Sequence, residues 1–417
     1  MNATQDAFAA LRYRDFSIVT LNQFCLTLAI LIQEIIVAYS LYKITKDPLT
    51  LGLIGLAEAI PFIALSLWGG YFADRFNKQT IMKICLFFAI PLPLVLWGLF
   101  HAYGLKQIEL STLSWGVYAV IFGLGTIRGF YNPSATSLKP FLIPREIYAN
   151  GATRTTIGWQ SGVIIGPMLG GFMLAFFGRE TSFISVAVLL SLCFLLVNLL
   201  SKRTFPKIET ERVLQSLGEG FRFIAKTKIV PWAISLDLVS VLFGGVIALL
   251  PIFAEDILKI GPEGLGYLRA APSIGALITM IALTRFPPTR HAWRNMLLAV
   301  AGFGLFTLLF AYSNYLWLSL FVLAMTGACD SISVVIRQTI LQIYPPENMR
   351  GRVAAVNGMF VSSSNELGAF ESGLAAKYLG PVIATVFGGS MTLLVVAFSW
   401  AKTKDLFGVN ITQAEQK

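Results

Sequence analysis

The sequence has little charge and few of the residues that enzymes use for catalysis. Only 13% of its 417 residues are charged, and it contains two histidines and four cysteines. It has no Walker A sequence, HExxH pair or CxxC motif, and each cysteine stands alone in an apolar stretch. We therefore expect neither an enzyme nor a nucleotide-driven pump, and no cofactor or metal site.

Long apolar runs make up most of the chain. Hydrophobic residues account for 56% of it, and its mean hydropathy is +0.71. A helix needs about 20 apolar residues to cross a bilayer. The sequence therefore predicts an all-α membrane protein with twelve transmembrane helices, at roughly 16–43, 49–73, 79–103, 112–138, 147–177, 181–201, 229–255, 263–285, 293–312, 315–343, 352–377 and 379–401.

The two sets of six spans repeat each other. A shift of 214 residues places 48–52 on 262–266. We predict two pseudo-symmetric halves, 1–201 and 229–404, with a cytoplasmic linker at 202–228 and a tail at 405–417. Such halves are typical of transporters that bind substrate between them near mid-membrane. A shift of 202 residues aligns further glycines: Gly125 with Gly327, Gly166 with Gly368, and Gly171 with Gly373.

Lysine and arginine are unevenly distributed between the two sides of this topology. With the N-terminus in the cytoplasm, 23 of the 32 lie in the tails and cytoplasmic connections, and six lie on the opposite side. This bias predicts that both termini are cytoplasmic. It also explains the net charge of +10 without nucleic-acid binding. Within the linker, apolar residues at helical spacing from Leu214 to Ile224 predict a basic amphipathic helix on the membrane surface, or alternatively a solvated linker.

One helix face in the fifth span consists of glycine. Gly162, Gly166 and Gly170 are four residues apart, which places them on one side of a helix. Pro167 and Gly171 complete the pattern GxxxGPxxGG, which predicts a bend and close packing against another helix. The alternative is an ordinary tight membrane crossing.

A second motif follows the second span. The small residues Gly69 and Gly70 permit close helix approach, and Asp74 is placed to cap or pair with a neighbouring helix terminus. Arg75 and Lys78 join this motif or serve as positive anchors at the membrane surface.

These motifs resemble those of the major facilitator superfamily. Residues 70–78 are similar to its loop signature, and the glycine pattern of the fifth span is similar to its antiporter motif. Residues 10–16, 51–57, 220–224 and 349–353 resemble the enterobactin-exporter-like branch, which includes siderophore and macrolide exporters. Two departures are Asn77, where glycine is usual, and Arg128, whose surroundings do not complete the R-x-x-Q-G pattern of proton antiporters.

Several charged residues lie inside the predicted spans. A lone charge there costs on the order of 3 kcal/mol, so these residues face protein or a watery cavity. The 202-residue shift places Arg128 on Asp330, and we hypothesise that the two couple across the cavity; the alternative is a static ion pair. Glu34, with no basic residue near it in its span, is placed to carry a proton. The pathway candidates are Glu34, Arg128, Asp237, Asp330, Arg337 and Glu366, where Glu366 offers a partner for Arg337.

Together these features predict a secondary active exporter of a small molecule. The resemblance implies a siderophore as cargo and a proton as coupling ion, in a monomer spanning the bacterial inner membrane. A multidrug or macrolide efflux antiporter of the same fold is the alternative, and a receptor that does not transport is a weaker one.

Overall fold

The computed structural model describes residues 9–201 and 213–409, so the expected linker and C-terminal tail lie partly outside the described residues. The described part is helical and contains no strand, which confirms the all-α class. The chain divides into two compact units. Unit 1 comprises Met1–Thr45, Ala57–Thr210 and Gly261–Tyr267; unit 2 comprises Lys46–Leu56, Glu211–Ile260 and Leu268–Lys417.

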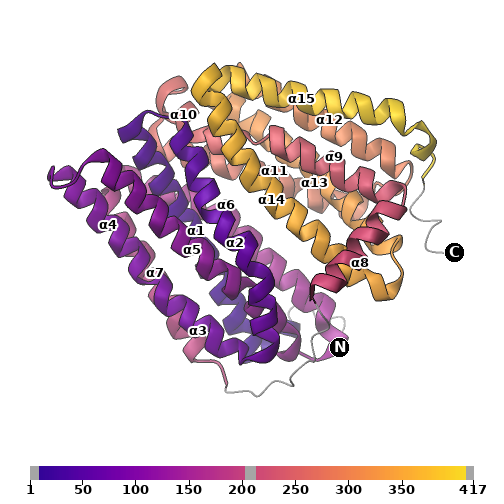
Figure 1. Cartoon of the computed structure of the whole chain (residues 1–417), viewed down its shortest axis with the longest axis horizontal. Helices are drawn as coiled ribbons and strands as arrows, with labels where there is room; N and C mark the ends of the chain where they lie inside the picture. The colour runs from indigo at the N-terminus through magenta and orange to yellow at the C-terminus, as the bar shows by residue number, and fades with distance from the viewer. Residues whose placement is uncertain (1–8, 202–212, 410–417) are drawn as a thin grey trace. The chain divides into compact units, whose positions relative to one another are not determined.

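Unit 1 is built from long helices that pack side by side. The helix α1 contacts α6 and α7, while α3, α4, α5 and α7 form a group of neighbours (Figure 1). The first two turns of α2 belong to unit 2. The helices are α1 (Arg14–Thr45), α2 (Leu49–Arg75), α3 (Lys78–Ala89), α4 (Pro91–Gly104), α5 (Leu110–Leu138), α6 (Tyr148–Phe176) and α7 (Gly178–Asn198).

Unit 2 has a similar construction. The helix α12 contacts α13 and α15, and α14 contacts α9, α15 and α8. The first residues of α11 belong to unit 1. The helices are α8 (Val213–Lys226), α9 (Ile229–Phe243), α10 (Leu250–Ile252), α11 (Gly261–Arg285), α12 (Ala292–Ala311), α13 (Leu316–Ile343), α14 (Glu347–Leu379) and α15 (Pro381–Lys402).

Eleven of the twelve predicted spans are confirmed as helical segments long and apolar enough to cross a membrane. The span predicted at 352–377 forms α14, which has 33 residues but is not among those eleven. At about 1.5 Å per residue, its length is ample for a bilayer. Its sequence is more polar than the other spans because it contains residues such as Arg352, Glu366 and Glu371.

Two predicted spans are interrupted, which the apolar pattern did not reveal. Pro91 has no N–H to donate, and the helix is divided there into α3 and α4. In the seventh span α9 ends at Phe243, and two glycines follow before α10 begins. A side chain at Gly244 would meet the carbonyl of Ser240 and the ring of Phe303, so the break requires glycine there.

The repeat predicted from the glycine register is visible in how the helices pack. In unit 1, Gly171 of α6 packs on Gly266, in the first part of α11. A methyl group at Gly171 would lie 3.0 Å from the Cα of Gly266. In unit 2, Gly373 of α14 packs on Gly52 of α2 in the same way, and the corresponding distance is 2.9 Å. The shifts of 202 and 214 residues relate these two contacts, which supports the duplicated sequence.

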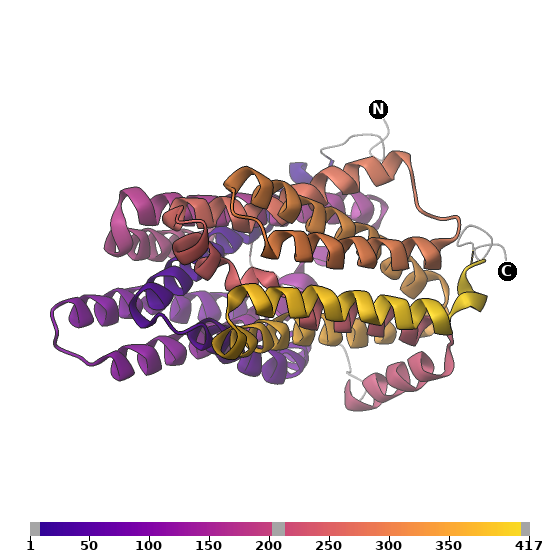
Figure 2. The same ribbon diagram turned by 90° about the horizontal axis from the view of Figure 1, so that it is seen from above.

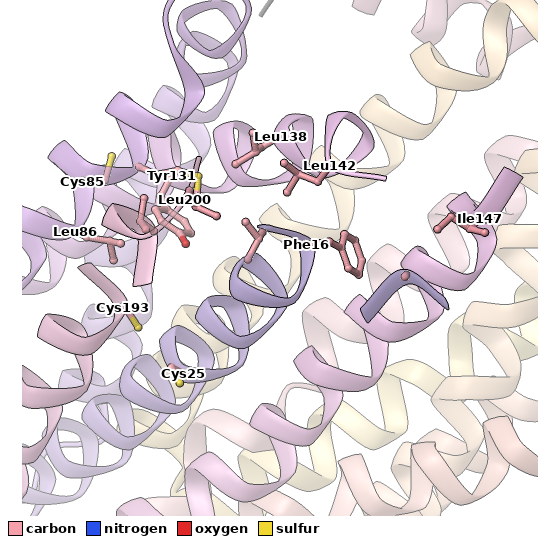
Figure 3. Close-up of a cluster of buried hydrophobic side chains, with 14 of the residues drawn as sticks. Phe16, Cys25, Cys85, Leu86, Tyr131, Leu138, Leu142, Ile147, Cys193 and Leu200 are labelled. Carbon is pink, nitrogen blue, oxygen red and sulfur yellow. The ribbon is translucent and has the colours of Figure 1, made fainter. Parts of the chain in front are cut away.

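A buried apolar cluster joins α1, α3, α5 and α7 in unit 1 (Figure 3). Asn22 lies within it, and its side chain donates to the carbonyl of Cys193 at 2.6 Å and accepts from the hydroxyl of Tyr131. Buried amides need such partners, so this network fixes how α1, α5 and α7 are rotated. An isolated cysteine in an apolar stretch is expected to be a buried free thiol. All four cysteines are free: Cys25, Cys85 and Cys193 are buried, whereas Cys329 is only partly buried.

The described part of the linker forms the helix α8, which Figure 2 shows on the outside of unit 2. Arg352 of α14 forms an ion pair with Glu219 of α8, and the ring of Phe360 stacks edge-on against Phe221. Ile224 is buried. The predicted helix is therefore present, and it is docked on α14. Its location on a membrane surface stays a prediction.

Candidate functional site

The glycine face of α6 packs against α1. At three successive positions a methyl group would come within about 3 Å of α1 atoms, so only glycine allows this approach. The predicted close-packing helix face is therefore present, and its partner is α1. The contacts are Gly162 with Thr27 at 2.9 Å, Gly166 with Leu31 at 2.9 Å and Gly170 with Ile32 at 3.1 Å.

Pro167 and Gly171 extend this contact to a second neighbour. The helix continues through Pro167 without interruption. The carbonyl of Pro167 lies 2.7 Å from where a methyl group at Gly266 would be placed. The C-terminal end of the glycine pattern therefore packs against the start of α11, while the preceding glycines pack against α1.

Glu34 lies on α1, within one turn of the atoms that contact Gly170. Its side chain is half-buried. The neighbouring Gln33 is buried, and its amide nitrogen has no hydrogen-bond partner among the described residues. The structure thus places Glu34 beside the α1–α6 seam, and its role as proton carrier stays a prediction.

Arg128 on α5 forms an ion pair with Glu58 on α2. The side chains are 31% and 13% exposed, and the guanidinium lies 5.4 Å from the centre of the Phe62 ring. A cation over an aromatic face is stabilised by the ring electrons. Glu58 lies within the second predicted span, but its 70-residue separation from Arg128 gave no reason to pair them.

Glycines bring α2 and α5 close enough for this pair. Gly125, one turn before Arg128, packs on the carbonyl of Glu58 itself. Gly129 packs on Leu65, and Gly69 packs on the carbonyl of Gly129. These glycine contacts form a seam between α2 and α5. The seam sets the rotation of α5 about its axis, and this rotation points Arg128 toward α2.

Arg337 on α13 and Asp237 on α9 form a second ion pair, in unit 2. It is more deeply buried than the first, with the two side chains 3% and 5% exposed. The sequence offers Glu366 as the partner of Arg337, and in the structure Asp237 takes this place. Glu366 lies on α14 with its carboxylate 3.5 Å from the position a Cβ would take on Gly55 of α2.

Asp330 lies seven residues before Arg337 on the same face of α13. Its side chain makes no hydrogen bond or ion pair with the residues that the structure describes. The predicted coupling of Asp330 with Arg128 stays a prediction, and the structure adds that Arg128 has a carboxylate partner within its own unit.

In the motif around residues 69–78, the structure shows which residues make the helix contact and the helix cap. A side chain at Gly70 would meet no atom within 4 Å, and the neighbouring Gly69 makes the close helix contact instead. Asn77, rather than Asp74, caps α3 by accepting from the backbone N–H of Gln79 at 2.9 Å. The close helix contact is therefore made by Gly69 and not by Gly70. The role of Asp74 as a cap or ion-pair partner of a neighbouring helix terminus stays a prediction. The face of α2 that meets α5 carries Gly69, and α2 continues past Asp74 before the chain turns into α3.

The two basic residues of this motif lie against aromatic rings. The guanidinium of Arg75 lies 4.5 Å from the centre of the Tyr71 ring. Lys78 is buried, and its ammonium lies 5.5 Å from the centre of the Phe141 ring. Arg75 is exposed and suits an anchor, whereas Lys78 is part of the packing between α3 and the short 3-10 helix Lys139–Phe141 that follows α5.

The sequence profile of the transmembrane secretion effector family matches residues 5–407. The chain belongs to this family of major facilitator superfamily transporters. This membership confirms the fold and the transport class that the motifs indicate, and it excludes an enzyme. Among the described residues, no group of three metal-binding side chains occurs.

Curated relatives of this transporter include exporters. The chain is 24% identical over 363 residues to the multidrug efflux pump Tap of Mycolicibacterium fortuitum, covering 82% of this chain and 84% of Tap. It is 24% identical over 400 residues to the enterobactin exporter EntS of Shigella boydii, covering 91% and 89%. A mutant of the nucleoside transporter NupG superposes with a TM-score of 0.73 at 13% identity over 93% of this chain and 99% of NupG, which shows the shared fold.

Proposed function

We propose that this transporter exports a siderophore from a bacterial cell by proton-coupled alternating access. The two six-helix halves, 1–201 and 229–404, rock about a substrate site near mid-membrane. The protein works as a monomer in the inner membrane with both termini in the cytoplasm. The similarity to EntS over 400 residues supports the siderophore as cargo.

The proposed coupling mechanism depends on one observation about Asp330. Arg128 and Arg337 each have a carboxylate partner inside their unit, whereas Asp330 makes no such contact among the described residues. Desolvation favours the neutral form of a carboxylic acid, so a span carboxylate without a cation takes up a proton readily. Release of the proton requires water or a cation to reach the carboxylate in the opposite conformation.

A multidrug efflux antiporter is the second candidate function. The similarity to Tap over 363 residues favours it, at the same identity as to EntS. Both functions use the same coupling residues and differ only in cargo. A receptor that does not transport would have no need for a carboxylate that exchanges protons.

Reconstitution into liposomes tests these proposals together. Vesicles with and without an imposed pH gradient are loaded with an iron-free catecholate siderophore or with a macrolide, and movement of the compound is followed. We expect gradient-driven transport of the siderophore, and loss of its pH dependence in Asp330→Asn. Glu109→Gln, which changes an exposed carboxylate before α5, serves as the matched control.

Different results of this assay test the cargo, the coupling residue and the exporter function separately. Gradient-driven transport of the macrolide alone supports the multidrug function. Transport by Asp330→Asn with an unchanged response to the gradient removes Asp330 from the coupling mechanism. Transport of neither compound in any condition contradicts the exporter proposal.

A further inference from the structure

Lys139 is a half-buried lysine of unit 1 that hydrogen-bonds to an uncharged group. It begins the 3-10 helix Lys139–Phe141 after α5, and its ammonium donates to Oε1 of Gln23 on α1 at 2.5 Å. No carboxylate among the residues that the structure describes forms an ion pair with it. Cations within membrane proteins usually pair with an acid or face a watery cavity. The positive charge of Lys139 is therefore not compensated within the described part of the chain.

The position of this ammonium differs from that of a surface anchor. A lysine that anchors a helix end extends away from the apolar region toward water. Lys139 reaches instead to Gln23, nine residues after α1 begins at Arg14, which is about 14 Å along the helix. On either side of it, Leu138 and Leu142 are buried in the apolar cluster of unit 1 (Figure 3). The backbone that carries Lys139 is therefore held in place by packing.

The hydrogen bond between Lys139 and Gln23 leaves only donors for a ligand. A lysine ammonium cannot accept, so the Gln23 oxygen is the acceptor and the amide nitrogen of Gln23 points its N–H groups elsewhere. That nitrogen makes no hydrogen bond to any described residue. The ammonium of Lys139 also has further N–H groups to donate. A positive charge surrounded by free N–H donors suits a carboxylate or a phenolate.

Gln23 belongs to a line of polar side chains on one face of α1. Charged and polar groups in a span face protein or water in preference to lipid. The two threonines of this face donate their protons to carbonyls of α1 itself, so they leave the donors of Lys139 and Gln23 unopposed. The line therefore marks a wet path along α1 in unit 1. Its members, all half-buried, are Thr20, Gln23, Thr27 and Glu34.

We propose that Lys139 and Gln23 bind the anionic group of the cargo as it enters from the cytoplasmic ends of α1 and α5. This inference rests on the proposed export function and narrows the cargo to molecules that carry a carboxylate or a phenolate. The same ammonium repels a cationic compound, so the pair selects cargo by charge. The two residues determine specificity at entry and are separate from Asp330, which is assigned to coupling.

Equilibrium binding to the purified full-length chain in a neutral detergent, without a pH gradient, tests the site. The probes are salicylate, an anionic phenol, and its neutral amide salicylamide, each followed by isothermal titration calorimetry. We expect the parent to bind salicylate about tenfold more tightly than salicylamide, which corresponds to about 1.4 kcal/mol. Lys139→Gln should bind the two probes equally, and Lys139→Arg should keep the preference. Equal binding of both probes by the parent, or binding of neither, overturns the proposal.

Two further variants assign the effect to this pair. Gln23→Glu keeps Lys139 but gives it an internal carboxylate, so it should abolish the preference for salicylate without lowering the melting temperature. Arg145→Gln is the matched control, because it removes an exposed cation six residues further along the chain. It should bind as the parent does. Loss of the preference in Arg145→Gln as well would overturn the assignment to Lys139.

The liposome transport assay separates this site from the export function. Gradient-driven transport of the siderophore by Lys139→Gln with an unchanged apparent affinity overturns the site and leaves the export function intact. A salicylate preference that depends on Lys139, in a protein that transports neither compound, supports the anion site and contradicts the export function.

Discussion

Asp237 on α9 and Arg337 on α13 form an ion pair in which both side chains are almost completely buried. The two residues are 100 positions apart in the sequence, on helices that the apolar pattern predicts separately. Burial removes both charges from water, and each compensates the other only while the pair is intact. The pair therefore fixes the rotation of α9 and α13 relative to each other within unit 2.

Asp237→Asn should destabilise the protein strongly because it leaves a buried arginine without its counter-charge. We expect a loss of about 3–5 kcal/mol in the free energy of unfolding. Asp237→Asn/Arg337→Met removes both charges and should recover most of that loss. Denaturation in detergent, followed by circular dichroism, measures it.

The control for this prediction is Glu219→Gln, which breaks the more exposed pair of α8 with Arg352. This change should cost about 0–1 kcal/mol, as surface pairs do. If Asp237→Asn costs no more than Glu219→Gln, the buried pair does not hold α9 and α13 together.

Glu58→Gln should destabilise the packing of α2 against α5 by roughly 1.5–3 kcal/mol, the contribution of a hydrogen bond to a charged group, and should thereby reduce transport. Arg128 then lies in a span without its carboxylate. The exchanged pair Glu58→Arg/Arg128→Glu restores opposite charges across the same seam and should recover part of the rate. The liposome transport assay measures both. Normal transport by Glu58→Gln would show that the pair is not needed for the transport cycle.

Gly125→Ala should destabilise unit 1 by about 1–3 kcal/mol, the usual cost of overpacking. The added methyl group would meet the carbonyl of Glu58 and would lie 2.9 Å from the ring of Pro61. Gly98→Ala in α4 is the matched control because a side chain there meets no atom within 4 Å. It should be neutral or stabilising, by up to about 1 kcal/mol from helix propensity. Thermal unfolding in one detergent compares the two variants. Equal shifts of the melting temperature would show that the close contact between α2 and α5 at Gly125 does not stabilise unit 1.

Stability should depend on pH through the ion pair of Lys228 with Asp405, which lies outside the spans. The hydrogen bond from Lys228 lowers the pKa of the Asp405 carboxyl in the folded protein. Because the folded pKa is below the unfolded one, the pair stabilises the folded state above the ordinary aspartate pKa of about 3.9. This stabilisation is lost as the pH falls through the lowered value.

Lys228→Gln tests that dependence. Its melting temperature should be lower than that of the parent at about pH 6, and the difference should disappear as the pH is lowered below about 4. The comparison is made on the same preparation across the pH series. A difference that stays constant over this range would mean that Asp405 does not titrate with a shifted pKa.

Apolar length and repeat spacing in the sequence determined the class and the order of the spans. A bilayer excludes unsatisfied backbone groups, so each apolar stretch of about 20 residues forms a helix whatever its neighbours are. The alignment of Gly171 with Gly373 also anticipated two equivalent close contacts, because only glycine allows backbones to approach so closely. The breaks at Pro91 and Gly244 were not evident, since apolar content does not change across them.

The partners of the charges in the spans were decided by the tertiary structure. The sequence placed Arg128 and Arg337 at membrane depth, but the rotation of each helix about its own axis selects the carboxylate that it meets. That rotation depends on contacts such as Gly125 with the carbonyl of Glu58, which join residues far apart in the chain. For the same reason, Gly69 rather than Gly70 makes the close contact near the end of α2. Adjacent residues on a helix point in directions about 100° apart, and only packing selects which of them faces the neighbour.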